Sequence, residues 1–402
     1  MLRVAITGIG VISAIGSNTP EFWDCLKAGR SGIRPLTSVD SNTLRFKNGA
    51  EVQGFDAEKY FDPKKADFLD RFAQFAVIAA REAVSDARLE WTPPLRANTA
   101  VVTGACVGGQ STEDRGFVDL YKANRNRVHP LTIPKSMANA GASHICMEFG
   151  VNGPGFTLST ACSSGAHALG LAYWMVRFGG VPMAIAGGSE APFSLGILKA
   201  WEALRVVSPT TCRPFSRDRD GMILGEGAAM LVLEPLDAAH ARGANIYGEI
   251  VGFGMSSDAG HLTHPEAGGA IMAMQRALDD AGLQPEQVGY INAHGTGTEV
   301  NDPTEVAAIR SVFGSHADRL AVSSTKSMHG HALGAAAALE AAAAILALHH
   351  KLLPPTANFT EADPACALDV IPNSSREAAV EYCLSNSFAF GGLNATLAFR
   401  RA

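Results

Sequence analysis

The amino-acid sequence predicts an α/β fold built from an internal duplication. Short apolar runs alternate along the chain with longer segments of helical periodicity, and two blocks of sequence recur in the same order. No Ser/Gly-rich or Pro-rich linker separates the halves. We therefore expect one compact unit, in which residues 1–250 form a first half and residues 251–402 form a second half.

Apolar runs of four to eight residues mark the expected strands. In chain order they cover residues 4–7, 100–103, 156–161, 183–186, 230–233 and 288–292. Runs without polar alternation are typical of strands that are buried on both faces of a sheet. One expected helix opens at residues 162–165, directly after a strand. An alanine-rich helix is expected to open at residues 326–331 in the same way.

Two pairs of segments carry the duplication. Residues 158–162, followed by His-Ala-Leu-Gly from 167, match residues 322–326, followed by the same four residues from 331. Residues 81–89 similarly resemble residues 275–283. Because both matches occur in the same order, each half is expected to run helix, strand, excursion, strand, helix. The excursion of the first half, between residues 104 and 156, is the longer one.

Composition excludes several classes of protein. Of the 402 residues, 47% are apolar and 18% are charged, which excludes a disordered chain. The 33 basic residues are outnumbered by 39 acidic ones, which argues against nucleic-acid binding. The longest apolar stretch begins at Leu333 and is interrupted by Glu340, so we expect no membrane span. The N-terminal residues resemble a first strand more than a signal peptide.

The seven cysteines are odd in number and form no Cys-x-x-Cys pair. This pattern predicts neither a disulfide framework nor a zinc site, and it is typical of a reducing cytoplasm. Cys162 stands apart, because it follows an expected strand and opens an expected helix. A helix N-terminus favours a thiolate by about 0.3 to 2 kcal/mol. Cys162 is therefore the leading candidate for a nucleophile, while a small core cysteine packed behind the turn remains the alternative.

Two histidines in the second half lie just after the ends of expected strands. His294 begins a glycine-rich loop that also contains Thr296 and Thr298, and His331 follows the strand that matches the one before Cys162. Ligands of α/β sheets collect at the carboxyl ends of strands, so these histidines are candidates to share a site with Cys162. His167 and His329 are weaker candidates.

Five motifs together resemble the elongating β-ketoacyl-(acyl carrier protein) synthases of the thiolase superfamily. They are residues 160–165 (Thr-Ala-Cys-Ser-Ser-Gly), 292–298 (Asn-Ala-His-Gly-Thr-Gly-Thr), 323–327 (Ser-Ser-Thr-Lys-Ser), 330–331 (Gly-His) and 386–392 (Asn-Ser-Phe-Ala-Phe-Gly-Gly). The likeness covers essentially the whole chain. Residues 198–203 and 211–216 particularly resemble the rhizobial nodulation ketosynthases.

The resemblance implies a five-layered αβαβα thiolase-like fold, which agrees with the duplication. It implies a decarboxylative Claisen condensation, in which an acyl thioester held on a cysteine reacts with malonyl-acyl carrier protein to give a 3-oxoacyl-acyl carrier protein. No cofactor or metal is implied. The expected partner is an acyl carrier protein bearing acyl and malonyl groups. A homodimer is expected, and a heterodimer with a second ketosynthase-like subunit stays open.

The resemblance also implies roles for individual residues. Cys162 would take the acyl chain, with the amides of Cys162 and Phe390 stabilising the oxyanion, and His294 and His331 would donate Nε2–H hydrogen bonds to the malonyl thioester oxygen. Lys326 and Glu340 would orient His331 and its helix. The remaining implied positions are Thr296 and Thr298 beside the pantetheine arm or malonyl group, Val107, Trp201 and Phe390 at the wall or gate of the acyl pocket, and Arg205, Lys64 and Lys65, with Arg125 and Arg127, at the carrier-docking surface.

The chain departs from the family pattern in two places. Ala389 stands where the family usually has glycine, and Leu393 replaces a usual threonine. A methyl group at residue 389 narrows the allowed backbone conformations, which bears on the mobility of Phe390 as a gate. Near residue 64, Asp67 and Phe68 follow the two lysines where the family tends to have basic residues.

Other classes of protein fit less well. The dinucleotide fingerprint that Gly8 and Gly10 suggest lacks its third glycine, because residue 13 is serine. A degradative thiolase would need a second active cysteine in the final glycine-rich loop, and a starter-type condensing enzyme would pair one histidine with an asparagine. A non-catalytic chain-length partner subunit is the main alternative, but such subunits usually lack the nucleophile.

Overall fold

The computed structural model describes residues 1–402, the whole chain. Ten strands form one hydrogen-bonded series in the order β5-β4-β6-β7-β1-β8-β14-β13-β9-β10. Their bounds are β1 (Val4–Ser13), β4 (Ala100–Gly104), β5 (Gly155–Leu158), β6 (Ala184–Glu190), β7 (Gly227–Pro235), β8 (Gly248–Ser257), β9 (Val288–Asn292), β10 (Ala321–Ser323), β13 (Tyr382–Phe388) and β14 (Leu393–Arg401). Two short ribbons pair β2 (Arg34–Pro35) with β3 (Asn48–Gly49) and β11 (Leu352–Leu353) with β12 (Arg376–Glu377).

The helices cover both faces of this strand series. They are α1 (Thr19–Lys27), α2 (Pro63–Asp67), α3 (Arg71–Asp86), α4 (Pro93–Asn98), α5 (Gln110–Phe117), α6 (Thr132–Ser136), α7 (Ala140–Phe149), α8 (Ser164–Arg177), α9 (Leu195–Leu204), α10 (Leu236–Ala241), α11 (Ala267–Ala281), α12 (Asn301–Phe313), α13 (Lys326–His329) and α14 (Ala336–His350). The 3₁₀ turn η6 (Leu333–Ala335) precedes α14.

The strand pairings repeat between the two halves of the chain. In the first half β4 runs parallel to β5 and β6, and β7 runs antiparallel to β6 and β1. In the second half β9 runs parallel to β10 and β13, and β14 runs antiparallel to β13 and β8. This repetition confirms the predicted duplication. β8 straddles the boundary expected after residue 250, and that division of the chain stays a prediction.

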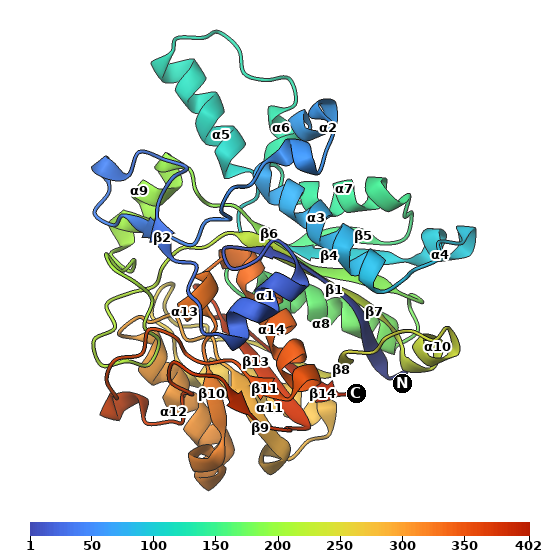
Figure 1. Cartoon of the computed structure of the whole chain (residues 1–402), viewed down its shortest axis with the longest axis vertical. Helices are drawn as coiled ribbons and strands as arrows, with labels where there is room; N and C mark the ends of the chain where they lie inside the picture. The colour runs from blue at the N-terminus through green and yellow to red at the C-terminus, as the bar shows by residue number, and fades with distance from the viewer.

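The two halves of the strand series enclose a central helical layer. β1 and β8 pair antiparallel over only three residues each, at Val4–Ile6 and Gly248–Ile250. The largest apolar cluster combines α8 and α14 with residues of strands from both halves. A second cluster packs α3 and α7 on the first half, and a third packs α11 and α12 on the second. Figure 1 shows the same stacking, which is the predicted five-layered αβαβα fold.

The central helix α14 owes its position to small side chains. All residues from Ala336 to Leu348 are buried, and most are alanine, which lets neighbouring backbones approach closely. By length and hydropathy the segment Leu333–His350 could cross a membrane, contrary to the expectation from sequence. Of this segment 89% is buried inside the protein, so its apolar surface is already covered by the protein's own core.

The turns that follow β5 and β10 differ from the expected boundaries. β5 ends at Leu158, and α8 begins at Ser164, so Cys162 precedes the helix and does not open it. Ala161 adopts a left-handed backbone with φ of +50°. In the second half, α13 is a separate single turn, and His331 lies between it and η6. The predicted strand at residues 288–292 matches β9.

Candidate active site

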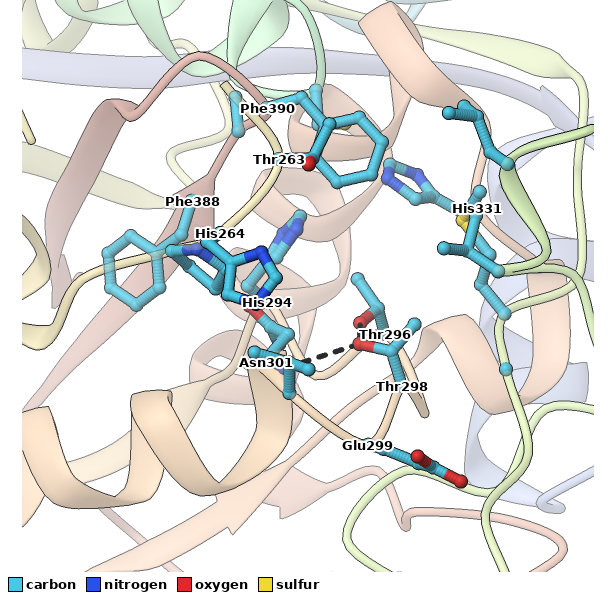
Figure 2. A pocket seen from close by; sticks show the side chains of 18 of the residues that line it. Thr263, His264, His294, Thr296, Thr298, Glu299, Asn301, His331, Phe388 and Phe390 are labelled. Atoms are coloured by element: carbon cyan, nitrogen blue, oxygen red, sulfur yellow. Dashed lines mark hydrogen bonds between the residues drawn. The ribbon is translucent and has the colours of Figure 1, made fainter. Parts of the chain in front are cut away.

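A cavity of about 400 Å³ opens between the two halves. It brings the side chain of Cys162 together with those of His294 and His331, which lie more than a hundred residues further along the sequence. Figure 2 shows His294, His331 and Phe390 around one space, with Thr296 and Thr298 below them. The cavity is further lined by Trp201, Leu204, Arg205, Val206, Asp220, Gly221, Met222, His261, Leu262, Thr263, His264, Pro265, Glu299, Val300, Asn301, Phe388, Ala389 and Gly392.

The Cys162 thiol is held in a protonated resting state. Burial raises its pKa to about 11, and the positive charge of Lys326 and the backbone N–H of Phe390 only partly oppose this effect. The backbone N–H of Cys162, just before the helix N-terminus, does lower this pKa, but the cost of desolvating a thiolate exceeds that effect, so the net shift is upward. The backbone N–H groups of Phe390 and Cys162 both stabilise charge at this sulfur.

His294 is fixed by hydrogen bonds on its backbone and on its ring. Its backbone N–H and that of Gly295 donate to the two carboxylate oxygens of Glu305, at 2.8 and 2.7 Å. The Lys326 ammonium donates to the His294 carbonyl at 2.6 Å and lies 3.3 Å from ring atom Nδ1. Because an ammonium can only donate, Nδ1 must accept, and the ring proton resides on Nε2.

His331 has the same tautomer as His294, with the proton on Nε2, but a different contact fixes it. The backbone N–H of Leu333 donates to Nδ1 of His331 at 3.2 Å, so Nε2 again carries the proton. The backbone of His331 is anchored to Ile223 and Gly225 through hydrogen bonds of 2.7 and 2.9 Å. The rings of His294 and His331 are nearly perpendicular, with their centroids 5.5 Å apart.

Both imidazoles are neutral at physiological pH. Burial lowers the pKa of each ring well below 6.5, and the Lys326 charge lowers both values further. A neutral imidazole with its proton on Nε2 is a hydrogen-bond donor that carries no net charge. Two such donors in one cavity can stabilise an oxyanion as it develops.

Lys326 and Glu340 form an ion pair that is almost completely buried. Burial raises the pKa of Glu340 to about 7, and Lys326 opposes that shift. Lys326 contacts His294, so the expectation that it orients His331 is wrong. The reason is topological, since α13 follows β10, and β10 is the neighbour of β9, the strand that precedes His294.

Phe390 and Trp201 form an aromatic wall of the cavity. Their rings stack with centroids 6.1 Å apart. The turn around Phe390 is held by hydrogen bonds from Gly391 N–H to the Leu262 carbonyl at 2.7 Å and from Gly392 N–H to the Ala389 carbonyl at 2.9 Å. This turn is therefore attached to the loop that follows β8.

Comparison with models of known protein families identifies the family of this chain. The model of the β-ketoacyl synthase N-terminal domain matches residues 1–239, and the model of the C-terminal domain matches residues 247–360. The chain belongs to the β-ketoacyl synthase family.

Two curated relatives align with this synthase over nearly its full length. Nodulation protein E of Rhizobium sp. (strain N33) is 45% identical over 99% of both chains. The 3-oxoacyl-[acyl-carrier-protein] synthase 2 of Staphylococcus aureus (strain MRSA252) is 40% identical over 100% of this chain and 98% of the relative. The resemblance to elongating synthases, with its inclination to the nodulation group, is confirmed.

Two solved structures share the fold. The ishigamide ketosynthase/chain length factor superposes with a TM-score of 0.94 at 39% identity, covering 100% of this chain and 99% of the other. A type II polyketide synthase ketosynthase, solved in complex with its acyl-carrier protein and bound to the hexaketide, superposes with a TM-score of 0.90 at 30% identity over 100% of both chains.

Several residues of this synthase that shape the site were not predicted. The loop after β8 lines the cavity with residues 261–265, and the buried carboxylates of Glu305 and Asp302 on α12 hold the loop that contains His294. The available sequence signal was that these two acids are three residues apart and closely follow the glycine-rich loop that contains His294. No comparable sequence signal distinguishes the loop after β8.

Other predicted residues lie outside the cavity of the synthase. Val107 does not line it, because the loop after β4 turns this side chain toward the surface, where it is 47% exposed. His329 is buried, with its ring atoms bonded to the Gly330 carbonyl and the Thr325 hydroxyl. His167 contacts the Ser163 carbonyl and the Thr160 hydroxyl. Both of these histidines fit a structural role.

The basic residues expected at the carrier-docking surface differ in their exposure and in whether they form ion pairs. Arg205 is exposed at the cavity and has no carboxylate within 4 Å. Lys64 is exposed as well. Lys65 forms an ion pair with Glu148, and Arg125 pairs with Asp119 at 3.2 Å, so their charges are already compensated. Arg127 is likewise exposed and forms no ion pair, so charge alone favours Arg205, Lys64 and Arg127.

Replacement of Lys326 by methionine is expected to lower the free energy of unfolding by about 3–5 kcal/mol, because Glu340 would remain buried without its cation. Burial would then hold the pKa of Glu340 above its unfolded value without opposition, so the loss should grow as the pH rises from 6 to 8. Urea unfolding at both pH values measures this. Lys65→Met removes a partly exposed pair and should cost at most about 1 kcal/mol.

Proposed function

We propose that Cys162, His294 and His331 catalyse the condensation of an acyl chain with malonyl-acyl carrier protein. As a β-ketoacyl synthase, the chain is a condensing enzyme of the acyltransferase class. The observation that carries the residue assignment is one cavity that contains a thiol and two neutral Nε2–H donors. This combination suits two successive reactions of thioesters.

The first reaction loads the acyl chain. The sulfur of Cys162 attacks the acyl thioester carbonyl, and the carbon–sulfur bond to the carrier's pantetheine breaks. The thiol proton ends on the departing pantetheine sulfur, so one thiol and one thioester are exchanged for another pair. The N–H groups of Cys162 and Phe390, which stabilise charge at the sulfur, are the proposed donors to the tetrahedral oxyanion.

The second reaction extends the chain by two carbons. The malonyl group loses carbon dioxide, and the electron pair of the broken carbon–carbon bond delocalises onto the thioester oxygen as an enolate. His294 and His331 donate hydrogen bonds to that oxygen. The enolate carbon then attacks the acyl-cysteine carbonyl, which releases the 3-oxoacyl carrier and the Cys162 thiolate, and the thiolate takes up a proton.

Mass spectrometry of carrier-bound products tests this function. The synthase is incubated with malonyl-carrier and with acyl-carriers of graded chain length. We expect a product that is longer by two carbons and that carries a 3-oxo group, together with an acyl adduct on the Cys162 peptide. An acyl adduct on another residue would contradict the assignment of the nucleophile.

A non-catalytic chain-length subunit is the alternative function. This alternative is considered because one similar solved structure is named a ketosynthase/chain length factor. The present chain retains Cys162 in a cavity with two imidazole donors, which a scaffold does not require. Acyl transfer to Cys162 in the isolated chain distinguishes the two functions, because the alternative predicts none.

Alkylation of Cys162 by iodoacetamide should have a distinctive pH dependence. Because burial raises the thiol pKa to about 11, the rate should rise roughly tenfold per pH unit between pH 8 and pH 10. Peptide mapping at each pH measures the rate. A plateau below pH 9 would show that the thiol has an ordinary or lowered pKa. Cys212, whose pKa burial raises to about 12, is the control and should react more slowly.

Arg205 is proposed as a contact for an acidic acyl carrier protein. Reversing this exposed charge with Arg205→Glu should raise the carrier KM by about fivefold, since an exposed ion pair contributes up to about 1 kcal/mol, and kcat should stay unchanged. The control is Arg217→Glu, because Arg217 is exposed but does not line the cavity. Steady-state kinetics with intact carrier measures both variants, and equal KM values in the two would refute the contact.

A homodimer is the proposed assembly. The excursion between β4 and β5 exposes several large apolar side chains, which include Phe117, Tyr121, Ile133 and Met137, and β5 is an edge strand. Exposed apolar patches and free strand edges are typical of subunit contacts. Figure 1 shows α5 projecting from the body on this excursion. Light scattering of the purified chain tests for a mass twice the 42.1 kDa of one copy.

We also propose a cytoplasmic location. All seven cysteines are free thiols in the structure. Free thiols of this number are typical of a reducing compartment. Fractionation of the host cell, with the chain detected by antibody, tests the proposal.

A further inference from the structure

A buried carboxylate that the proposed reactions do not use lies behind the active site. Glu190 ends β6, and its side chain is 1% exposed. It accepts hydrogen bonds from the backbone N–H groups of Cys106 at 2.6 Å, Gly334 at 3.2 Å and Gly108 at 3.4 Å. Burial raises its pKa to about 7, and only backbone N–H groups oppose that shift. Glu190 thus lacks the basic partner that buried carboxylates usually have.

The donors to Glu190 come from two segments that adjoin the reacting groups. Gly334 follows His331 by three residues, in the turn whose Leu333 N–H sets the His331 tautomer. Cys106 lies on the loop after β4, in the other half of the duplication. The Cys106 carbonyl accepts a hydrogen bond at 2.9 Å from the hydroxyl of Ser159, which lies three residues before Cys162. One carboxylate therefore joins the His331 turn to the loop beside Cys162.

The glycines at this junction have no room for a side chain. A Cβ atom at residue 334 would lie 2.4 Å from the Cys106 nitrogen and 2.7 Å from a Glu190 oxygen. A Cβ atom at residue 104 would lie 2.4 Å from the Ser164 backbone, and one at residue 165 would lie 2.9 Å from the Ala338 nitrogen. The loop after β4, the start of α8 and the turn before α14 thus touch backbone to backbone. Close packing transmits a displacement of one segment to the others.

We propose that Glu190 is a positioning residue, which fixes the position of the turn carrying His331 relative to the loop beside Cys162. The proposal rests on the proposed function of those two residues. An ionised carboxylate only accepts hydrogen bonds and has about four acceptor sites, so it can satisfy all of these N–H donors at once. A glutamine offers one carbonyl oxygen and would direct its NH₂ group at an N–H donor, which forces the segments apart.

The test compares Glu190→Gln with a matched variant, Glu82→Gln. Glu82 on α3 is half-buried, also has no basic partner, and accepts from the backbone N–H groups of Val11 and Thr19, both at 2.7 Å. Condensation kinetics and urea unfolding are measured for both. For Glu190→Gln we expect kcat to fall at least tenfold with the carrier KM within about twofold, because misplacement of about 1 Å costs up to a hundredfold in rate. For Glu82→Gln we expect a loss of stability with unchanged kcat.

The outcomes separate the proposals. If wild type is active and Glu190→Gln keeps kcat within twofold, or if Glu82→Gln loses as much kcat, the positioning role is overturned while the function stands. If wild type makes no product with any donor, both proposals are overturned. If Glu190→Gln does not fold, Glu190→Asp replaces it, since the shorter carboxylate keeps the charge. Full kcat in Glu190→Asp overturns the role, and an intermediate loss with unchanged KM supports it.

Discussion

Replacing Cys162 by alanine is expected to lower the rate of condensation at least roughly ten-thousandfold, as loss of a nucleophile does in other covalent enzymes. The acyl chain would have no sulfur to occupy, while the two imidazole donors would remain in place. The substitution removes only the sulfur atom of residue 162, so the fold should persist. Product formation by mass spectrometry and thermal unfolding by circular dichroism measure the two effects.

Cys383→Ala is the matched control for this variant. Cys383 is equally buried, but it lies in β13 and does not line the cavity. Its replacement should leave the rate of condensation unchanged. Condensation that persists in Cys162→Ala would refute the nucleophile, and a similar loss in both variants would mean that any buried thiol is needed for the fold.

The second large effect is expected for the histidines. His331→Ala removes one of the two Nε2–H donors, and loss of one oxyanion donor typically costs about 2.7 to 4 kcal/mol. The rate of condensation should therefore fall about a hundredfold or more, and His294→Ala should behave similarly. Loading of the acyl chain onto Cys162 should be affected less, because backbone amides stabilise that oxyanion. Single-turnover assays of each reaction measure the difference.

His329→Ala is the control for loss of a buried imidazole. This ring hydrogen-bonds to Thr325 and Gly330 and does not line the cavity, so its removal should reduce stability but not the chemical step. Equal rate losses in His329→Ala and His331→Ala would contradict a specific donor role. Equal losses in acyl loading and condensation would contradict the separate roles of the backbone amides in loading and of the imidazoles in condensation.

Patterns local in sequence predicted the fold well. Strands buried on both faces appear as continuous apolar runs, and the run at 288–292 matches β9 residue for residue. The repeated blocks predicted two halves with the same strand order, which the pairings confirm. Duplication is visible because both copies must satisfy the same backbone geometry. The start of α8 was displaced by two residues, because the strained backbone at Ala161 delays the helix.

Burial decided the properties of the groups that the sequence singled out. A helix-dipole argument predicted a lowered thiol pKa, but the three-dimensional cavity removes water from Cys162, and desolvation dominates. Likewise, the role implied by the family resemblance paired Lys326 with His331, whereas in the structure Lys326 contacts His294. Val107 turned outward because a loop direction depends on the segments that pack against it.

The sequence by itself predicted most of the strands, the duplication, and one thiol and two imidazoles as candidate reacting groups, because these follow from residue type, short-range periodicity and motif resemblance. Only the tertiary structure decided which proton each imidazole carries, which residues hold it, and that the thiol is protonated at rest. Those properties depend on partners such as Lys326 and Glu305, which come from other elements of the fold, and on the exclusion of water that packing produces.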